Sequence, residues 1–246
     1  MKFRLMGITD LSTVDWPGGL AAIVFFQGCN LCCPWCQNVD GIDPRGGKVA
    51  EVEDTIEHLK GLKPMIDSIV ITGGEPLLQP EACLEILKTA NGLGLKCAIE
   101  TNATDSQALR RLLPHLDLVA IDVKAPLSDP KFYEKITGSV GVPRLVQKIK
   151  ESLQLAIDSR AEVEVRTTVV PTLNDDEKIV AQLVDDIKDA DCLRFQQFRN
   201  QHTLDPSFQR LPSPSREKLL KLAHGVKRKG LKNVKIFTVE GGLETV

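Results

Sequence analysis

The sequence predicts an α/β protein: a partial (β/α)6 barrel of the TIM type, with parallel strands, as a single domain over residues 1–246. Three observations predict this class. Short apolar, β-branched runs recur along the chain, most of them apolar enough to be covered on both faces. Longer segments of helical period lie between them. No Pro/Gly/Ser linker or low-complexity tract divides the chain, and 246 residues with 42% hydrophobic content can bury one large core.

The expected elements follow one another in strand–helix order. Strands are predicted at 21–26, 68–72, 96–101, 116–122, 162–170, 192–197 and 233–237, where β-branched and apolar residues are concentrated. Helices are predicted at 52–62, 80–93, 105–113, 175–187 and 215–229. Gly94 and Asp175 are typical stop and start signals. The clearest helix carries one buried stripe, formed by Val142, Leu145, Val146, Ile149, Leu153, Ala156 and Ile157.

Two terminal segments are distinguished within the single domain, the second of which includes the last predicted helix and strand. Residues 1–20 precede the first barrel strand, and residues 199–246 form a C-terminal extension. Within that extension, 199–215 contains Pro206, Pro212 and Pro214 and is the longest irregular stretch. We therefore expect a surface loop near a partner there.

Composition limits the classes of partner. With 31 basic and 33 acidic residues the formal net charge is −2, which argues against nucleic acid as a partner. A local basic patch could still bind RNA, and its alternative interpretation is a solvated helix end: Lys221, Lys227, Arg228, Lys229 and Lys232. The amino terminus lacks the apolar core of a signal peptide, and no apolar run reaches the roughly 20 residues that span a bilayer. We expect a cytoplasmic protein with no membrane partner.

Four of the seven cysteines lie within Cys29–Cys36, a clustering that indicates metal or redox chemistry in a reducing compartment. Thiolates suit iron–sulfur clusters and zinc, but no fourth ligand is near in sequence, since the four histidines are scattered. A cubane held by three cysteines would keep one iron open for a substrate. A structural metal site, or plain buried cysteines, is the alternative. Either Cys32 or Cys33 can supply the middle thiolate.

In a barrel, the loops after the strands carry the active site, and the unusual residues of this chain fall there. These loops are Gln27-Gly28-Cys29, Gly73-Gly74-Glu75-Pro76, Glu100-Thr101-Asn102 and Asp122-Val123-Lys124. Two residues without Cβ allow close approach of backbone to a ligand, and the following carboxylate can accept from an ammonium group. Each loop also has a purely structural interpretation. Residues 73–76 could be a simple turn, 100–102 could be polar residues that end a strand, and Asp122 and Lys124 could form a salt bridge on one face of the strand.

The three-then-two spacing, with Trp35 before the last cysteine, resembles the radical S-adenosylmethionine (SAM) superfamily. There the open iron chelates SAM, and reduction cleaves it to methionine and a 5′-deoxyadenosyl radical. The segments 13–18, 25–29 and 35–38 further resemble the glycyl-radical-enzyme activases, which act on pyruvate formate-lyase or anaerobic ribonucleotide reductase. The similarity covers most of residues 7–124.

The resemblance implies a role for each motif residue. It makes Cys29, Cys33 and Cys36 the ligands of a [4Fe–4S] cluster and leaves Cys32 a bystander. It places Trp35 near adenine and Asp15 against the partner's glycyl segment. The remaining residues would hold SAM through its amino group, its ribose or its carboxylate: Gly73, Gly74, Glu75, Thr101, Asn102, Asp122 and Lys124. Of these, Asp122 and Lys124 would also contribute to a site for a monovalent cation.

The sequence also departs from this pattern. Gln37 stands where many activases have histidine, and Glu100 where many have aspartate. Arg166 and Gln197 lie near later strand ends and could contact the carboxylate or the adenine, but polar residues are common there, so neither is included among the expected site residues.

The resulting hypothesis needs no catalytic residue beyond the cluster and its cosubstrate, because the protein's side chains position rather than react. The expected partners are a glycyl radical enzyme, first of all anaerobic ribonucleoside-triphosphate reductase, and a one-electron donor such as flavodoxin or ferredoxin. Two alternatives remain. A radical SAM enzyme that modifies RNA, a peptide or a small metabolite would keep the chemistry and change the target. A non-catalytic metal-binding interaction module would have its fourth coordination position filled.

Overall fold

The computed structural model describes residues 1–139 and 144–246, which form two compact units. Each unit is assembled from segments that are separate in sequence. The first unit comprises Met1–Asn30, Asp40–Ala120 and Glu151–Glu162, and the second comprises Leu31–Val39, Ile121–Lys150 and Val163–Val246. The cysteine loop therefore begins in the first unit and continues in the second.

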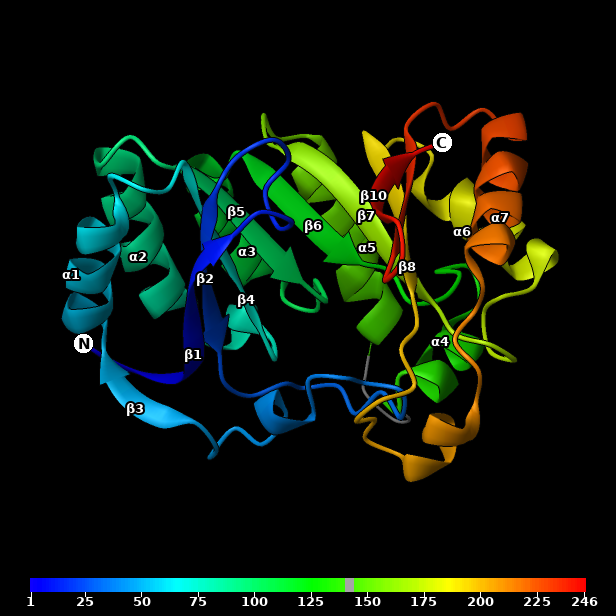
Figure 1. The fold of residues 1–246 in the computed structure, drawn as a ribbon, viewed down its shortest axis with the longest axis horizontal. Coiled ribbons are helices and arrows are strands. Elements are labelled where there is room, and N and C mark those ends of the chain that lie inside the picture. The colour runs from blue at the N-terminus through cyan, green and yellow to red at the C-terminus, as the bar shows by residue number, and fades with distance from the viewer. Residues whose placement is uncertain (140–143) are drawn as a thin grey trace. The chain divides into compact units, whose positions relative to one another are not determined.

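The first unit contains five complete strands of the sheet. They are β1 (Lys2–Ser12), β2 (Ala21–Phe26), β3 (Lys48–Glu51), β4 (Ser68–Gly73) and β5 (Lys96–Thr101). Strands β2, β4 and β5 are parallel neighbours, and β1 pairs antiparallel with both β2 and β3 (Figure 1). Because β2, β4 and β5 run parallel, the loops that follow them leave the sheet at the same edge.

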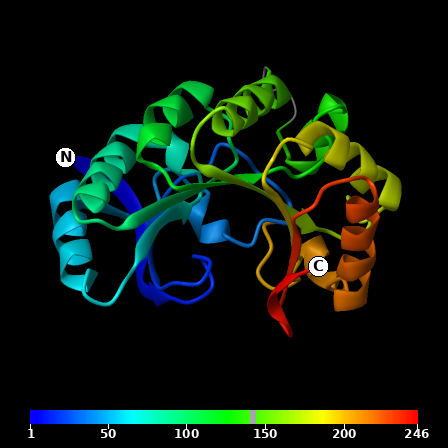
Figure 2. The same cartoon turned by 90° about the horizontal axis from the view of Figure 1, so that it is seen from above.

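Three helices of the first unit lie along one side of its strands, coloured cyan to green in Figure 2. They are α1 (Val52–Leu62), α2 (Pro80–Gly92) and α3 (Ser106–Leu112). Short 3-10 turns lie before β3 at Val39–Gly41, before α2 at Pro76–Leu78 and after α3 at Leu113–His115. Asp105 begins α3, since its carboxylate accepts from the backbone N–H groups of Gln107 and Ala108. Acidic residues in the first turn of α1 have the favourable orientation to the helix dipole.

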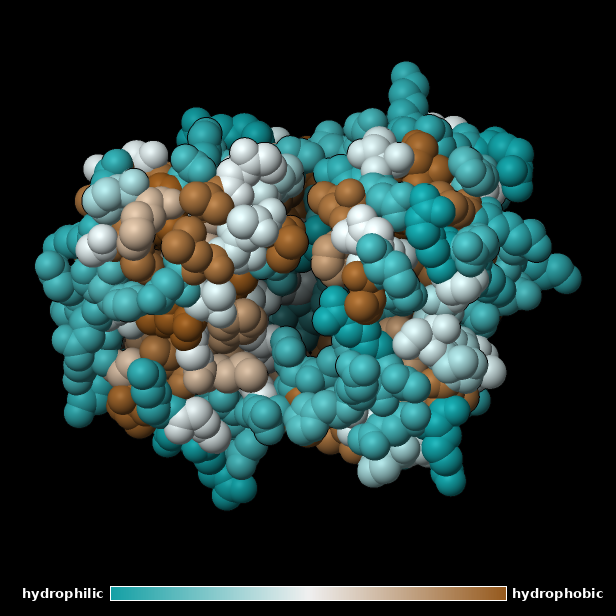
Figure 3. Space-filling model, in the orientation of Figure 1, coloured by the Kyte–Doolittle hydropathy of each residue, from teal (hydrophilic) through white to brown (hydrophobic). Residues whose placement is uncertain are grey.

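The opposite face of the first unit's sheet carries a small apolar cluster near the amino ends of the strands. Its buried members are Ala21, Ile23, Val70, Ala98 and Leu118, and Trp16 and Phe25 pack against them. The two alanines leave space for the large rings. The segment between β1 and β2 thus covers the amino ends of the strands, while β1 leaves Leu11 46% exposed. Brown, apolar surface is visible over this unit in Figure 3.

The second unit has its own parallel strands, β7 (Glu162–Val169, whose first residue belongs to the first unit), β8 (Cys192–Gln197) and β9 (Val234–Thr238). Strand β10 (Gly242–Thr245) pairs antiparallel with β9. The helices are α4 (Pro130–Ile136), α6 (Glu177–Ile187) and α7 (Arg216–Arg228), with a 3-10 turn at Pro206–Arg210. Helix α7 packs on α6 and against β8 and β9. Strand β6 (Leu118–Asp122) and α5 (Leu145–Ile157) each have residues in both units.

The predicted α/β class with mostly parallel strands is confirmed. All seven predicted strands and all six predicted helices are present with boundaries shifted by at most about one helical turn. Val142 of the predicted helical stripe lies outside the described residues. The sequence reading missed β1, β3, β10 and α4, which are short or only half buried. The single-domain assignment stays a prediction. No helix within the described residues combines the length and the apolarity that crossing a membrane requires.

Candidate active site

The structure groups the predicted site residues in two sets, one in each unit. The first unit holds Cys29 together with the motif residues that follow β4 and β5. The second unit holds Cys33, Trp35 and Cys36 together with Asp122 and Lys124, which lie at the end of β6. Each set is connected by hydrogen bonds or side-chain contacts.

The chain enters the cysteine loop through a tightly held turn. Gly28 has φ +96°, a conformation that side chains rarely adopt, and a Cβ there would lie 3.1 Å from Cα of Pro44. Its N–H donates to the Gly41 carbonyl at 2.8 Å, and the Cys29 N–H donates to the Ile42 carbonyl at 3.0 Å. The backbone at Gly28 and Cys29, the first of the predicted ligands, is therefore fixed by the segment that follows the cysteine loop.

The two glycines at the end of β4, its last residue Gly73 and the next residue Gly74, are required by close backbone packing within the first unit. A Cβ on Gly73 would lie 2.2 Å from the Phe26 carbonyl oxygen, and one on Gly74 would lie 2.3 Å from the Gly28 carbonyl oxygen. The N–H of Gly74 donates to the Phe26 carbonyl at 2.9 Å, and the N–H of Glu75 donates to the Gly28 carbonyl at 2.7 Å. The motif thus binds the end of β4 to the end of β2, in addition to any contact with a ligand.

Glu75 is buried, with 1% exposure, and both of its carboxylate oxygens accept hydrogen bonds. One oxygen accepts from the Thr101 hydroxyl at 2.6 Å and from the Leu77 N–H at 3.0 Å. The other accepts from the Asn102 N–H at 2.7 Å. Glu75 therefore fixes the loop after β5 against the loop after β4.

Asn102 connects that loop to the first cysteine. Its side-chain amide donates to the Asn30 side-chain oxygen at 2.9 Å and lies 3.9 Å from Sγ of Cys29. The hydroxyl of Thr104 donates to the Asn102 side-chain oxygen and accepts from the Asn30 amide, both at 2.7 Å. The first unit thereby brings Cys29, Glu75, Thr101 and Asn102 into one hydrogen-bonded group.

The second unit holds the other two cysteines in a single turn, in which the Cys36 N–H donates to the Cys33 carbonyl at 2.9 Å. Cys33 is buried, and burial raises the pKa of the Cys36 thiol. The Cys32 N–H donates to the Thr137 carbonyl at 3.2 Å. Gly138 has φ +64°, and a Cβ on it would lie 2.4 Å from the Cys32 carbonyl oxygen. The segment after α4 therefore supports the middle of the cysteine loop.

Trp35 and Lys124 lie together beside this turn. The indole N–H of Trp35 donates to the Ile136 carbonyl at 3.2 Å, and the Lys124 ammonium lies 5.5 Å from the ring centroid. Lys124 also pairs with Asp122 at 3.1 Å. Burial alone would lower the pKa of Lys124, but Asp122, Cys33 and Tyr133 outweigh it and raise that pKa. The lysine is thus held as a cation near two of the cysteines predicted to bind the cluster.

Asp15 does not join either group. It lies between β1 and β2, before the amino end of β2, and accepts a short hydrogen bond from the Ser12 hydroxyl. Ala21 pairs with Ser68 at that end of the parallel strands, whereas Phe26 pairs with Gly73 at the other end. Five residues of strand correspond to roughly 16 Å, so Asp15 is well separated from the glycine motif of the first unit.

A buried ionic cluster occupies the strands of the second unit. Glu164, 2% exposed, pairs with Arg166 at 2.7 Å, with Arg194 at 3.4 Å and with Lys235 at 3.3 Å. Burial opposes its ionisation, but these cations outweigh that effect and lower the pKa of the Glu164 carboxyl. Gln197 supports the C-terminal extension, because its amide donates to the Pro214 carbonyl and accepts from the Val239 N–H, both at 2.8 Å.

The cysteines suit an iron–sulfur cluster in their chemistry. All seven lie among the described residues, and none forms a disulfide. Three thiols on one short loop, with a side-chain amide 3.9 Å from the first sulfur, form a soft donor set with a hydrogen-bond donor beside it. In residues 1–139 and 144–246, no three His, Cys, Asp or Glu side chains are arranged to hold a metal ion. The assignment of the cluster depends on the ligand chemistry and on the family.

Comparison with known proteins decides the family. The model of the radical SAM superfamily matches residues 23–184, which include every predicted ligand of the cluster. The chain belongs to the radical SAM superfamily. It is 35% identical over 248 residues to a protein of Methanocaldococcus jannaschii that bears the provisional name glycyl-radical enzyme activating enzyme, covering 99% of this chain and 100% of that protein. This radical SAM protein is thus an enzyme of the activating-enzyme type, with a [4Fe–4S] cluster and SAM as cofactors.

Other relatives agree. The pyruvate formate-lyase-activating enzyme of Clostridium pasteurianum is 32% identical over 205 residues, which cover 82% of this chain and 83% of that enzyme. Among solved structures, a radical SAM methyltransferase from Sphaerobacter thermophilus has a TM-score of 0.70 at 14% identity, covering 95% of this chain and 72% of that one. At that identity the likeness shows the fold, which is the partial barrel of radical SAM proteins.

Several residues that build this radical SAM site were missed in the sequence. Asn30 lies inside the cysteine motif, but nothing local indicates that its partners are Asn102 and Thr104. Gly138 carries only the ordinary signal of a glycine shortly after a helix. Its contact with Cys32 requires the fold.

Proposed function

We propose that this radical SAM enzyme generates a glycyl radical on a partner enzyme. The observation that carries the proposal is the 35% identity with a protein named as a glycyl-radical enzyme activating enzyme over 99% of this chain. A [4Fe–4S] cluster held by Cys29, Cys33 and Cys36 would supply the one-electron reduction of SAM, with the electron coming from an external donor. Cleavage of SAM would give methionine and a 5′-deoxyadenosyl radical, and that radical would take a hydrogen atom from the partner's glycine. The products are 5′-deoxyadenosine and the glycyl radical.

The contacts of the chain support the positioning role assigned to its side chains. Glu75 and Asn102 hold the loops after β4 and β5 around Cys29, and Lys124 presents a cation beside Cys33 and Cys36. A fixed cation can orient the SAM carboxylate, and Asp122 beside it would complete a site for a monovalent cation. Trp35 would lie near the adenine. Cys33 rather than Cys32 is the middle ligand, since Cys33 is buried and Cys32 is exposed.

Two partner enzymes are candidates. Anaerobic ribonucleoside-triphosphate reductase is the first, from the motif pattern of the sequence. Pyruvate formate-lyase is the second, because the relative from Clostridium pasteurianum is named as its activating enzyme. In either case we expect the partner's glycyl segment to contact Asp15, near the end of β2 opposite the glycine motif, so that segment would have to extend from there to the carboxyl end of the strands. Flavodoxin or ferredoxin would supply the electron. The clustering of four cysteines in one short loop, which suits metal binding in a reducing compartment, favours the cytoplasm.

The function is tested in two stages without oxygen. The reconstituted enzyme, given dithionite and SAM, should release 5′-deoxyadenosine, and none above background would refute the radical SAM activity. Each candidate partner is then added, and electron paramagnetic resonance should show a stable glycyl radical with one of them. Release of 5′-deoxyadenosine without a glycyl signal on any encoded partner would favour RNA, a peptide or a small metabolite as the target.

A further inference from the structure

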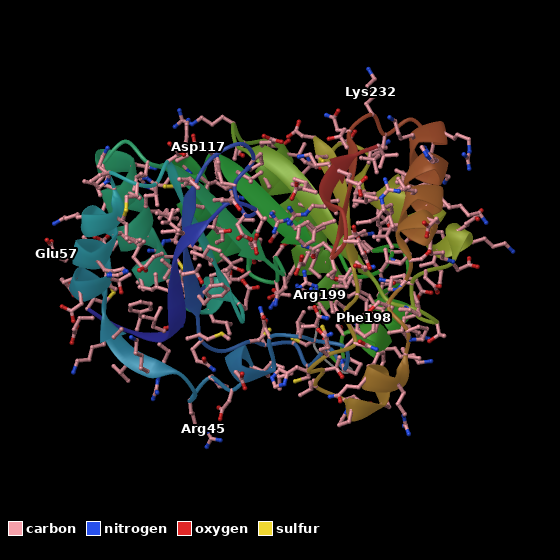
Figure 4. The ribbon with its side chains drawn as sticks, in the orientation of Figure 1. Arg45, Glu57, Asp117, Phe198, Arg199 and Lys232 are labelled. Atoms are coloured by element: carbon pink, nitrogen blue, oxygen red, sulfur yellow. The ribbon has the colours of Figure 1, made fainter. Side chains whose placement is uncertain are left out.

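The irregular stretch after β8 contacts the cysteine loop of the second unit at three points. The Leu204 N–H donates to the Cys36 carbonyl at 3.1 Å, and the Asp205 N–H donates to the Pro34 carbonyl at 2.8 Å. The side-chain amide of Gln37 makes a short hydrogen bond to the Arg199 carbonyl. Figure 4 labels Phe198 and Arg199, which follow the end of β8. Two segments about 165 residues apart in sequence are thus paired.

This stretch has internal hydrogen bonds that do not involve the cysteine loop. The Asn200 amide donates to the Leu211 carbonyl at 3.0 Å and closes the loop at its base. The Thr203 hydroxyl donates to the Asp205 carbonyl, and the Asp205 carboxylate accepts from the Ser207 N–H, both at 2.8 Å. The stretch therefore has a defined shape of its own, against which the cysteine loop can be held.

The cysteine loop is held on a second side by the residues after α4, as Cys32 and Trp35 bind the Thr137 and Ile136 carbonyls. Those two hydrogen bonds are donated by the residue before Cys33 and by the second residue after it. The contacts from the stretch after β8 reach it on both sides of Cys36. Cys36 is only partly buried, so packing alone constrains it less than Cys33.

We propose that Gln37 is a positioning residue for the cluster: its bond to the Arg199 carbonyl closes a clasp, formed with the Leu204 and Asp205 amides, that fixes the backbone on both sides of Cys36. The Cys36 carbonyl accepts from the Leu204 N–H, and the Pro34 carbonyl accepts from the Asp205 N–H. The turn that carries the last ligand therefore cannot rotate without breaking these two hydrogen bonds. Contacts that orient a metal ligand typically change metal affinity by about 10- to 100-fold when they are removed. The inference concerns the cluster and holds for any partner enzyme.

The test uses the complete chain and three variants. Gln37→Met keeps the length of the side chain and removes its donor, and Gln37→His keeps an N–H donor. Gln201→Met is the matched control, because Gln201 is an exposed glutamine on the same stretch. Hydrogen exchange of the peptide spanning residues 203–206 is measured in the cluster-free protein. The rate of cluster loss under a chelator is then followed by visible absorbance in the loaded protein.

We expect Gln37→Met to speed exchange of that peptide by about 2- to 12-fold, the range that one hydrogen bond of net 0.5–1.5 kcal/mol implies. Cluster loss should accelerate by at least the same factor, while Gln201→Met and Gln37→His behave like the parent protein. Unchanged exchange and unchanged cluster loss in Gln37→Met would overturn the proposal. Faster cluster loss without faster exchange would also overturn it, since the effect would not pass through the clasp. If Gln37→His also speeds both hydrogen exchange and cluster loss, the hydrogen bond donated by residue 37 is not what holds the loop, and the proposal is overturned.

Discussion

Gly74 is the position at which a single methyl group should disturb the site most directly. In Gly74→Ala the new Cβ would lie 2.3 Å from the Gly28 carbonyl oxygen and 2.4 Å from the Gly41 carbonyl oxygen. Both atoms are backbone, so no side chain can rotate away, and the chain must move by about 1 Å to reach van der Waals distance. Overpacking of this kind costs about 1–3 kcal/mol. We expect the upper end of that range because two rigid atoms are met at once.

The displacement would also reach the cluster site, because Gly28 precedes Cys29 and accepts the Glu75 N–H at 2.7 Å. Urea unfolding of the cluster-free protein should show the midpoint lowered at unchanged slope, and the reconstituted protein should hold less iron. Gly61→Ala is the control, since nothing lies within 4 Å of a Cβ at that position in α1. It should be stabilised by up to about 1 kcal/mol through helix propensity. A Gly74→Ala midpoint equal to the parent's would refute the close packing described here.

Three further predictions concern other parts of the site and the fold. Glu75→Gln replaces one carboxylate oxygen with an NH2 group, which would face a donor such as the N–H of Asn102 or of Leu77. The substitution should lower the free energy of unfolding by about 1–3 kcal/mol in urea melts. The lowered pKa of Glu164 implies stability that is complete above its ordinary value of 4.5 and is lost as pH falls through the folded-state pKa. Unfolding followed from pH 7 to pH 3 should show this slope reduced in Glu164→Gln, and an equal slope would contradict it. Cys33→Ala should abolish 5′-deoxyadenosine formation while Cys32→Ala keeps most of it, and the reverse result would exchange their assignments.

Most regular elements could be predicted from local pattern. The boundaries of β2, β5, β8 and α1 agree with the structure to the residue, since each is a continuous apolar run or a clear helical period between turn signals. Strand β1 was missed because only Phe3 and Leu5 are buried along it, so its alternation is short. Helix α4 has only seven residues, fewer than two complete periods of its pattern.

The sequence by itself determined the chemistry of this protein. Cysteine spacing, the glycine–glutamate motif and the positions of both after apolar strands are properties of nearby residues, and they were sufficient to indicate the radical SAM family. Only the tertiary structure decided how these residues are held. That Gly74 packs on Gly28, that Asn102 reaches Cys29, and that residues after β8 clasp Cys36 are contacts between segments far apart in sequence. The physical reason is that a backbone carbonyl can accept from any donor and a backbone N–H can donate to any acceptor. The partner that each group finds is therefore set by which segments folding brings together.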